Sequence, residues 1–139
     1  MSNTLLRRGS LVAAALGLPL LLGVGSCPHP NPIIFVHGAS GSGAQFESQA
    51  MRFESNGYPT NFIRVLEYDS SVPLTNPANL AVVHAALDAL IAELQAETGA
   101  HQVDLMGHSL GTFVSQSYLS TPARAANVAH YVNIDGATA

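Results

Sequence analysis

The sequence predicts an α/β fold in which a parallel sheet carries helices on both faces. Short apolar runs of strand-like composition alternate along the chain with longer segments of helical periodicity. Glycine, proline and asparagine residues separate these segments, as expected of turns. Because strand-helix-strand units join parallel strands by right-handed crossovers, this alternation favours one parallel sheet between two layers of helices.

The start of the chain has the composition of an export signal. Arg7 and Arg8 form a positive region, an apolar stretch follows at residues 11–22, and small residues come next. A membrane-spanning helix needs about 20 apolar residues, and Pro19 with nearby glycines disfavours one here. We therefore assign residues 1–26 to a signal peptide.

The chain after this leader forms one predicted domain. Residues 27–32 contain three prolines and are expected to be a stiff tether that cannot join the centre of a sheet. Residues 33–139 are long enough for one domain with one hydrophobic core.

The first half of this domain is predicted to contain two strands. The run at residues 32–36 is fully apolar, as in a buried parallel strand. A helix at 44–55, which Asn56 and Gly57 stop, leads to a second strand at 61–68.

The second half begins, after a loop bounded by prolines, with the longest predicted helix. Apolar residues at helical spacing place it at 79–98, and Gly99 ends it. The remaining predicted elements are a strand at 101–106, a helix at 110–119, a turn at 121–122 and a strand at 128–134.

Residues 107–111 read GHSLG, a GxSxG pentapeptide between a strand-like run and a helix-like run. In a strand-turn-helix elbow the serine backbone is strained. The glycines two residues before and after it are needed because a Cβ there would collide with the crossing chain. Ser109 is therefore a candidate nucleophile.

A second pattern lies at the end of the first strand, which stops at His37 and Gly38 before the glycine-rich residues ASGSG. A strand ending in HG, with GHSLG about 70 residues later, resembles the α/β-hydrolase superfamily, and most closely its small bacterial lipases and esterases. The resemblance covers about residues 32–135. It implies that the four strands are the third to sixth of that fold, in the order 4-3-5-6, with strand 61–68 outermost.

The resemblance implies a carboxylic-ester hydrolase that acts on a small-molecule or lipid ester through an acyl-serine on Ser109. The backbone N–H of Leu110, at the start of a helix, is one expected donor to the oxyanion. By resemblance the second donor is the N–H of Ala39, and His37 and Gly38 shape the loop that carries it. No cofactor is implied, and no cluster of side chains has the spacing of a metal site.

The general base is not identified by the sequence. Of the six histidines, only His37 is expected at the carboxyl edge of the sheet beside the elbow, and in related enzymes this position rarely acts as a base. The other histidines are predicted to lie on the tether, within a helix, at the starts of strands or pointing away from the serine, and they are His29, His84, His101, His130 and His108.

For the acid that orients the base, Asp135 is the first candidate. It follows the last strand, the location that pancreatic-type lipases use. Glu67 and Asp69, at the end of another strand, are weaker alternatives. An ordinary loop carboxylate is the favoured interpretation of these two residues and an equal alternative for Asp135. Asp104 is expected to open its strand rather than to act in catalysis.

By resemblance, the catalytic histidine is expected after an eighth strand, at least about 60 residues beyond the sixth. We therefore expect residues 33–139 to be the N-terminal part of the domain, truncated before that histidine. The last strand is then expected to be a bare edge with unpaired N–H and C=O groups.

The leader predicts an exported protein, and the charge of the chain after it limits the partners. Counted from Cys27, three arginines against nine acidic residues give a net charge of −6, and the chain has no lysine. This disfavours binding to nucleic acid or to anionic lipid headgroups. Residues 24–27 resemble the site before the acylated cysteine of bacterial lipoproteins, which implies membrane attachment through Cys27. Ordinary signal-peptidase cleavage and free secretion are the alternative.

Two other classes of function compete with the enzyme. A non-catalytic envelope protein or binding module of the same fold would keep GHSLG only as a tight turn. Nucleotide binding draws on the glycines of residues 38–43, but Ala44 and Gln45 stand where a P-loop needs lysine and then serine or threonine. Nucleotide binding is therefore disfavoured.

Overall fold

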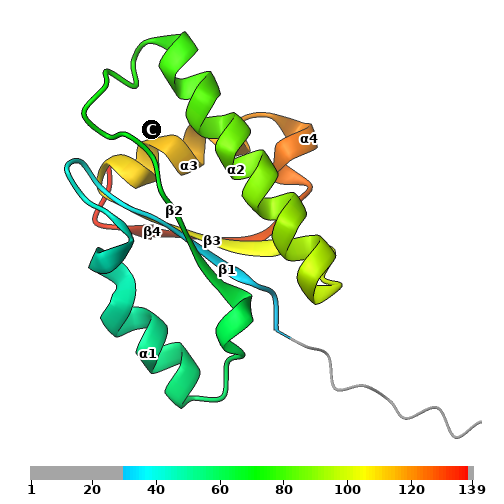
Figure 1. The fold of residues 1–139 in the computed structure, drawn as a ribbon. Helices are drawn as coiled ribbons and strands as arrows, with labels where there is room; N and C mark the ends of the chain where they lie inside the picture. The colour runs from blue at the N-terminus through cyan, green and yellow to red at the C-terminus, as the bar shows by residue number, and fades with distance from the viewer. Residues whose placement is uncertain (1–29, 138–139) are drawn as a thin grey trace, which may run out of the picture.

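The computed structural model describes residues 30–137 and contains one parallel sheet of four strands (Figure 1). The strands are β1 (Ile33–Val36), β2 (Ile63–Leu66), β3 (Val103–His108) and β4 (Val128–Ile134). Their order across the sheet is β2-β1-β3-β4, and each neighbouring pair is parallel. Both the predicted parallel sheet and the predicted strand order are thus confirmed. The signal peptide, Cys27 and His29 lie outside the described residues.

Helices cover both faces of the sheet, as predicted (Figure 1). One face carries α1 (Glu47–Ser55), and the opposite face carries α2 (Pro77–Thr98) and α3 (Leu110–Leu119). By length and composition alone α2 could cross a membrane, but its buried side chains pack against the sheet. Gly99 ends α2 in the left-handed conformation, with φ of 72°.

Several predicted boundaries are wrong. The strand predicted at 61–68 is the shorter β2, which follows a 3₁₀ turn at Thr60–Phe62, and the helix predicted at 79–98 begins at Pro77. The helix predicted at 44–55 is a 3₁₀ turn at Gly43–Phe46 followed by α1. The strand predicted at 101–106 is displaced toward the elbow, because Gly107 pairs with both β1 and β4 and His108 pairs with β4. The predicted turn at 121–122 opens a short helix, α4 (Pro122–Ala125), because a proline is well accommodated at the first helical position.

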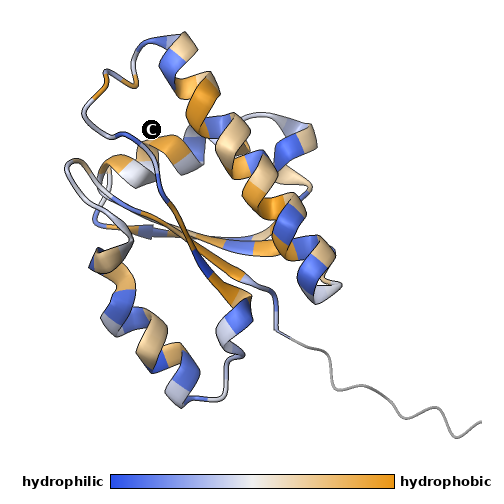
Figure 2. Cartoon of the chain, in the orientation of Figure 1, coloured by the Kyte–Doolittle hydropathy of each residue, from blue (hydrophilic) through white to orange (hydrophobic). Residues whose placement is uncertain are grey.

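The strand β1 lies at the centre of the core, and all four of its residues are buried. Ile34 and Val36 pack with α2 and α3, whereas Ile33 and Phe35 pack on the side of α1. Figure 2 shows this strand as predominantly hydrophobic, in contrast to the polar outer side of α1. Burial on both faces explains why β1 is an uninterrupted apolar run rather than an alternating one.

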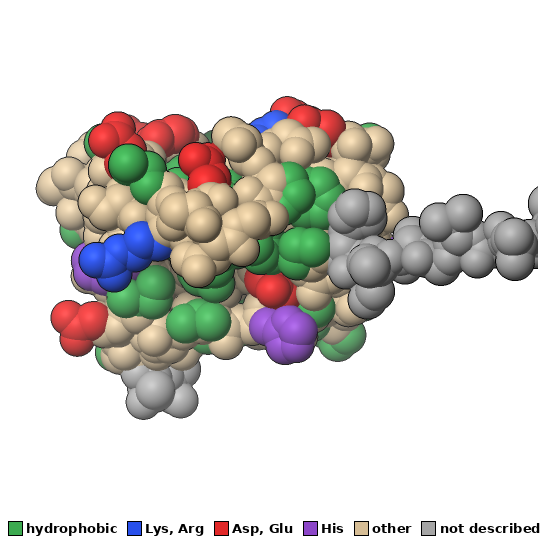
Figure 3. All heavy atoms as spheres, turned by 90° about the horizontal axis from the view of Figure 1, so that it is seen from below, with side chains coloured by type: hydrophobic (Ala, Val, Ile, Leu, Met, Phe, Trp, Pro, Cys, Tyr) green, Lys and Arg blue, Asp and Glu red, His purple; other side chains and the backbone are tan. Residues whose placement is uncertain are grey.

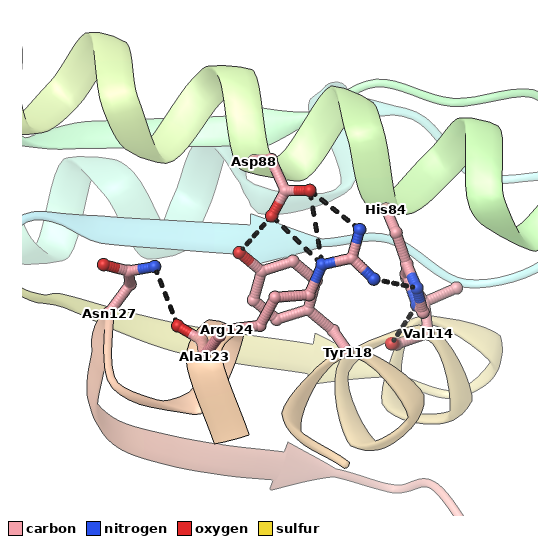
Figure 4. Close-up of polar contacts among 7 residues, drawn as sticks. All are labelled: His84, Asp88, Val114, Tyr118, Ala123, Arg124 and Asn127. Atoms are coloured by element: carbon pink, nitrogen blue, oxygen red, sulfur yellow. Dashed lines mark hydrogen bonds and ion pairs between the residues drawn. The ribbon is translucent and has the colours of Figure 1, made fainter. Parts of the chain in front are cut away.

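A polar network joins α2, α3 and α4 on one side of the sheet (Figure 4). Asp88 on α2 accepts hydrogen bonds from the Tyr118 hydroxyl at 2.7 Å and from Arg124 Nη2 at 2.8 Å. His84 Nε2 donates to the carbonyl of Val114, and Arg124 Nη1 donates to His84 Nδ1. These hydrogen bonds connect the three helices and give the buried polar side chains their partners.

The strand β4 is at the edge of the sheet, and among residues 30–137 no strand pairs with its outer side. Val132 on this strand is 41% exposed. Viewed from the side of α1, hydrophobic side chains are visible at the surface (Figure 3). The described part of the fold therefore leaves the β4 side of this face less covered than the β1 side.

Candidate active site

Ser109 lies at the sharp bend between β3 and α3. Its backbone has φ of 50° and ψ of −117°, a conformation that costs a non-glycine residue about 1–3 kcal/mol. The bend is held on both sides, because the Ser109 N–H donates to the Ile134 carbonyl at 3.1 Å and the Ser109 carbonyl accepts from the Thr112 N–H at 2.9 Å. Ser109 itself is exposed.

The two glycines of the pentapeptide are required by close backbone packing. A Cβ on Gly111 would lie 2.7 Å from the carbonyl oxygen of His37 and closer still to that of Val36. A Cβ on Gly107 would lie 2.7 Å from the carbonyl oxygen of Gly111. Real Cβ atoms essentially never come within 3.0 Å of such atoms. The first turn of α3 therefore rests directly on the end of β1.

The residues that follow β1 form a loop beside the serine, which we call the oxyanion loop and define as residues 38–43. A Cβ on Gly38 would lie 3.1 Å from the Cβ of Ser109, so the loop starts in contact with the elbow. Within residues 30–137, the backbone N–H groups of Ala39 and Leu110 donate no hydrogen bond. Both predicted oxyanion donors are thus without an intramolecular acceptor in the described residues.

His37 is fully buried below this loop. Its Nδ1 donates to the Gly38 carbonyl at 2.9 Å, and its ring stacks on Tyr68 with 4.3 Å between centroids. The Tyr68 hydroxyl donates to the His37 carbonyl at 2.7 Å, and burial raises the pKa of Tyr68 to about 12. These contacts suit the predicted role of His37 in shaping the loop. The other ring nitrogen, Nε2, lies 3.7 Å from the Glu67 carboxylate and makes no recorded contact with Ser109.

An open cavity of about 400 Å³ adjoins the serine. Asp135 lines it in the left-handed conformation, with φ of 52°, and its side chain is exposed. The fold thus brings this predicted acid and the predicted nucleophile to one cavity. The full lining consists of Ser109, Leu110, Phe113, Gln116, Asp135, Gly136 and Ala137.

Among the described residues, no histidine makes a recorded contact with the Ser109 side chain. His108 Nδ1 accepts from the Gln45 amide, and His130 Nδ1 lies 2.8 Å from Asp104 toward the opposite end of the sheet. His84 belongs to the polar network of α2, α3 and α4. The structure therefore leaves the general base of residues 30–137 unassigned, as the sequence does.

The two weaker acid candidates are occupied elsewhere. Asp69 accepts from the Ser71 hydroxyl at 2.6 Å and from its N–H, and these bonds lower the pKa of Asp69. Glu67 accepts from the N–H of Gly43 on the oxyanion loop. Sequence reasoning missed this link between the end of β2 and the loop. The available signal was that adjacent parallel strands bring their carboxyl ends to the same edge.

Comparison with known proteins agrees with this geometry. Residues 33–138 match the alpha/beta hydrolase family. No curated protein matches the chain. The family match covers almost all of the described residues, including the β1 end, the elbow and the cavity. The chain therefore belongs to the alpha/beta hydrolase family.

Proposed function

We propose that this chain is a serine ester hydrolase of the lipase or esterase type, with Ser109 as its nucleophile. The observation that carries the proposal is the positive φ of Ser109 at a strand-to-helix bend, since a β-carbon is kept there at a cost in strain. Backbone strain of this kind is typical of a residue that must present its side chain to a ligand.

The proposed reaction has two steps. In the first, Ser109 Oγ attacks the ester carbonyl carbon while a base takes its proton, and the amides of Ala39 and Leu110 donate to the oxyanion. The C–O bond to the alcohol then breaks, and the alcohol leaves with a proton, so that an acyl-serine remains. In the second, water attacks this acyl group and releases the carboxylic acid and free Ser109. Loss of one oxyanion donor typically raises such a barrier by about 3–4 kcal/mol.

The cavity beside Ser109 supports an ester with an apolar acyl group. Leu110, Phe113 and Ala137 supply apolar lining next to the nucleophile, and Asp135 and Gln116 supply polar groups. Asp135 is the proposed acid for a base placed between it and Ser109. The proposed site uses no metal or organic cofactor.

A non-catalytic binding module of the same fold is the second candidate. The observation that favours it is that no histidine in residues 30–137 makes a recorded contact with the Ser109 side chain. In this case the cavity binds an ester or acid without cleaving it, and GHSLG serves only as a tight turn. Export and attachment to the cell envelope through Cys27 remain part of the proposal for either candidate.

A fluorophosphonate probe with a long alkyl chain separates the two candidates. Ser109 Oγ would form a bond to phosphorus, fluoride would leave, and the proton would pass to a base. We expect a covalent adduct on the peptide that contains Ser109, detected by mass spectrometry. Added imidazole should accelerate its formation, because it can accept the proton that no described histidine is placed to take.

The controls are two single substitutions. Ser109→Ala should abolish the adduct, and Ser48→Ala, which changes an exposed serine on α1, should leave it intact. If the folded wild-type chain forms no adduct with or without imidazole, the enzyme proposal is wrong and the binding module is favoured.

A further inference from the structure

We propose that Glu67 is a positioning residue that fixes the oxyanion loop from the end of the neighbouring strand. The inference rests on the proposed function, since it concerns the loop that carries the Ala39 donor. Glu67 directly follows β2, whose partner strand β1 leads into the loop. Its two carboxylate oxygens face the two ends of that loop.

The first contact is with the far end of the loop. Glu67 Oε1 accepts a hydrogen bond from the Gly43 N–H at 2.6 Å. A carboxylate is a strong acceptor for a backbone amide, and such bonds are shorter and stronger than neutral ones. A Cβ on Gly43 would collide with this oxygen, so the glycine is what allows the carboxylate to reach the amide.

The second contact is with the near end of the loop. Glu67 Oε2 lies 3.7 Å from Nε2 of His37, beyond the range of a hydrogen bond, and this contact is attractive when Nε2 carries a proton. This Nε2 is buried and has no hydrogen-bond partner within residues 30–137. Because His37 Nδ1 donates to the Gly38 carbonyl, the position of the ring is coupled directly to the start of the loop.

Inside the loop, the Gly41 N–H donates to the Gly38 carbonyl at 3.1 Å. Ala39 and Ser40 are exposed, Ser40 has a positive φ of 54°, and glycines stand at three of the six loop positions. The recorded anchors from outside come largely from the segment after β2: besides Glu67, the Tyr68 hydroxyl donates to the His37 carbonyl, and Ser70 Oγ accepts from the Ser40 N–H at 2.8 Å. Of these three side chains, Glu67 is the one whose recorded contacts reach both ends.

The position of the oxyanion loop matters because the Ala39 N–H must lie within hydrogen-bond distance of the oxyanion. Gly38 packs against Ser109, so a displaced loop shifts the Ala39 N–H relative to the serine. A displacement of about 1 Å in a reacting site can lower a rate by about 100-fold. The side chain of Glu67 therefore controls rate through the backbone that it holds, without touching the ester.

The test uses Glu67→Ala, Glu67→Gln and the charge-matched control Glu54→Ala, which removes an exposed carboxylate on α1. The first measurement is amide hydrogen exchange at Gly43. The second is Ser109 phosphonylation, separated into its maximal rate and the half-saturating probe concentration. Thermal unfolding monitors stability in parallel.

We expect Glu67→Ala to speed exchange at Gly43 and to lower the maximal phosphonylation rate by about tenfold or more, with little change in half-saturation. Glu67→Gln should recover part of both, because its amide oxygen can still accept from the Gly43 N–H. Glu54→Ala should match the wild type.

The inference is overturned if Glu67→Ala leaves exchange at Gly43 and the maximal rate unchanged, or if its folded fraction reacts at the wild-type rate. Failure of the wild-type chain to react at all would instead contradict the proposed function. Exchange at Gly43 in the variants then decides by itself whether Glu67 holds the loop.

Discussion

Gly111→Ala tests the packing of α3 on β1 most directly. In an unobstructed helix this substitution stabilises a protein by about 1 kcal/mol, because alanine has the higher helix propensity. Here the added methyl would lie 2.7 Å from the His37 carbonyl oxygen and from the Val36 carbonyl carbon, and closer to the Val36 oxygen. Both obstacles are backbone, so no side chain can rotate away.

The steric term should prevail over the propensity term. Overpacking a core typically costs about 1–3 kcal/mol, and a backbone obstacle on a fully buried strand belongs at the upper end. After subtraction of the propensity gain, a net loss of about 2 kcal/mol corresponds to a fall in Tm of roughly 8–16 °C for a domain of this size. It is also a large fraction of the 5–15 kcal/mol that stabilises an ordinary domain.

Differential scanning calorimetry of the wild type, Gly111→Ala and Ser117→Ala measures this effect. Ser117 is on the same helix, and its side chain has no recorded partner, so its substitution should change stability by no more than about 0.5 kcal/mol. An unchanged or raised Tm for Gly111→Ala would show that α3 does not rest on the end of β1, and the described elbow would then be wrong.

Two further predictions concern strain and pH. Ser109→Gly should raise Tm by the equivalent of about 1 kcal/mol, because relief of about 1–3 kcal/mol of strain exceeds the entropic cost of glycine. Ser109→Ala keeps the strained backbone and should not raise Tm. Equal Tm values for the two variants would contradict this prediction. Burial lowers the pKa of His84, so the unfolded chain takes up a proton first as the pH falls. The contribution of His84 to the free energy of unfolding is therefore fully present above about pH 6.5, and it is lost as the pH falls from there toward the lowered pKa of the folded state. His84→Gln should flatten the decline in Tm between pH 7.5 and 5, and the exposed control His101→Gln should retain it.

The parts of the fold that were predictable from sequence have strong local patterns. The apolar run of β1, the helical spacing of α2 and the alternation of elements predicted the parallel sheet between helices, and the resemblance to the α/β-hydrolase superfamily supplied the strand order. Boundaries failed where tertiary pairing overrides local preference. Gly107 reads as the end of a strand, yet it pairs with Val36 and Asn133 and carries β3 on to His108. Pro122 reads as a turn, yet it starts a helix.

The candidate site also contains features that were predictable from the sequence and features that were not. The bend at Ser109 follows from the spacing of two glycines, which is a local property of the sequence. The contact of Glu67 with Gly43 joins residues on different strands and has no local pattern, so only the folded arrangement reveals it. The roles of the histidines were equally hard to predict from the sequence. An imidazole can pack, form an ion pair or act as a base, and its neighbours in the folded structure decide which.

The helix α3 is anchored at both of its ends. Its first turn rests on β1 through Gly111, and Tyr118 near its last turn is bound to Asp88 of the polar network (Figure 4). Ten helical residues span about 15 Å, so the network fixes the orientation of a rigid helix whose other end carries Ser109, the proposed nucleophile. Substitutions that loosen this distant anchorage will therefore misalign Ser109, and a screen for inactive variants will recover them together with those of the site itself.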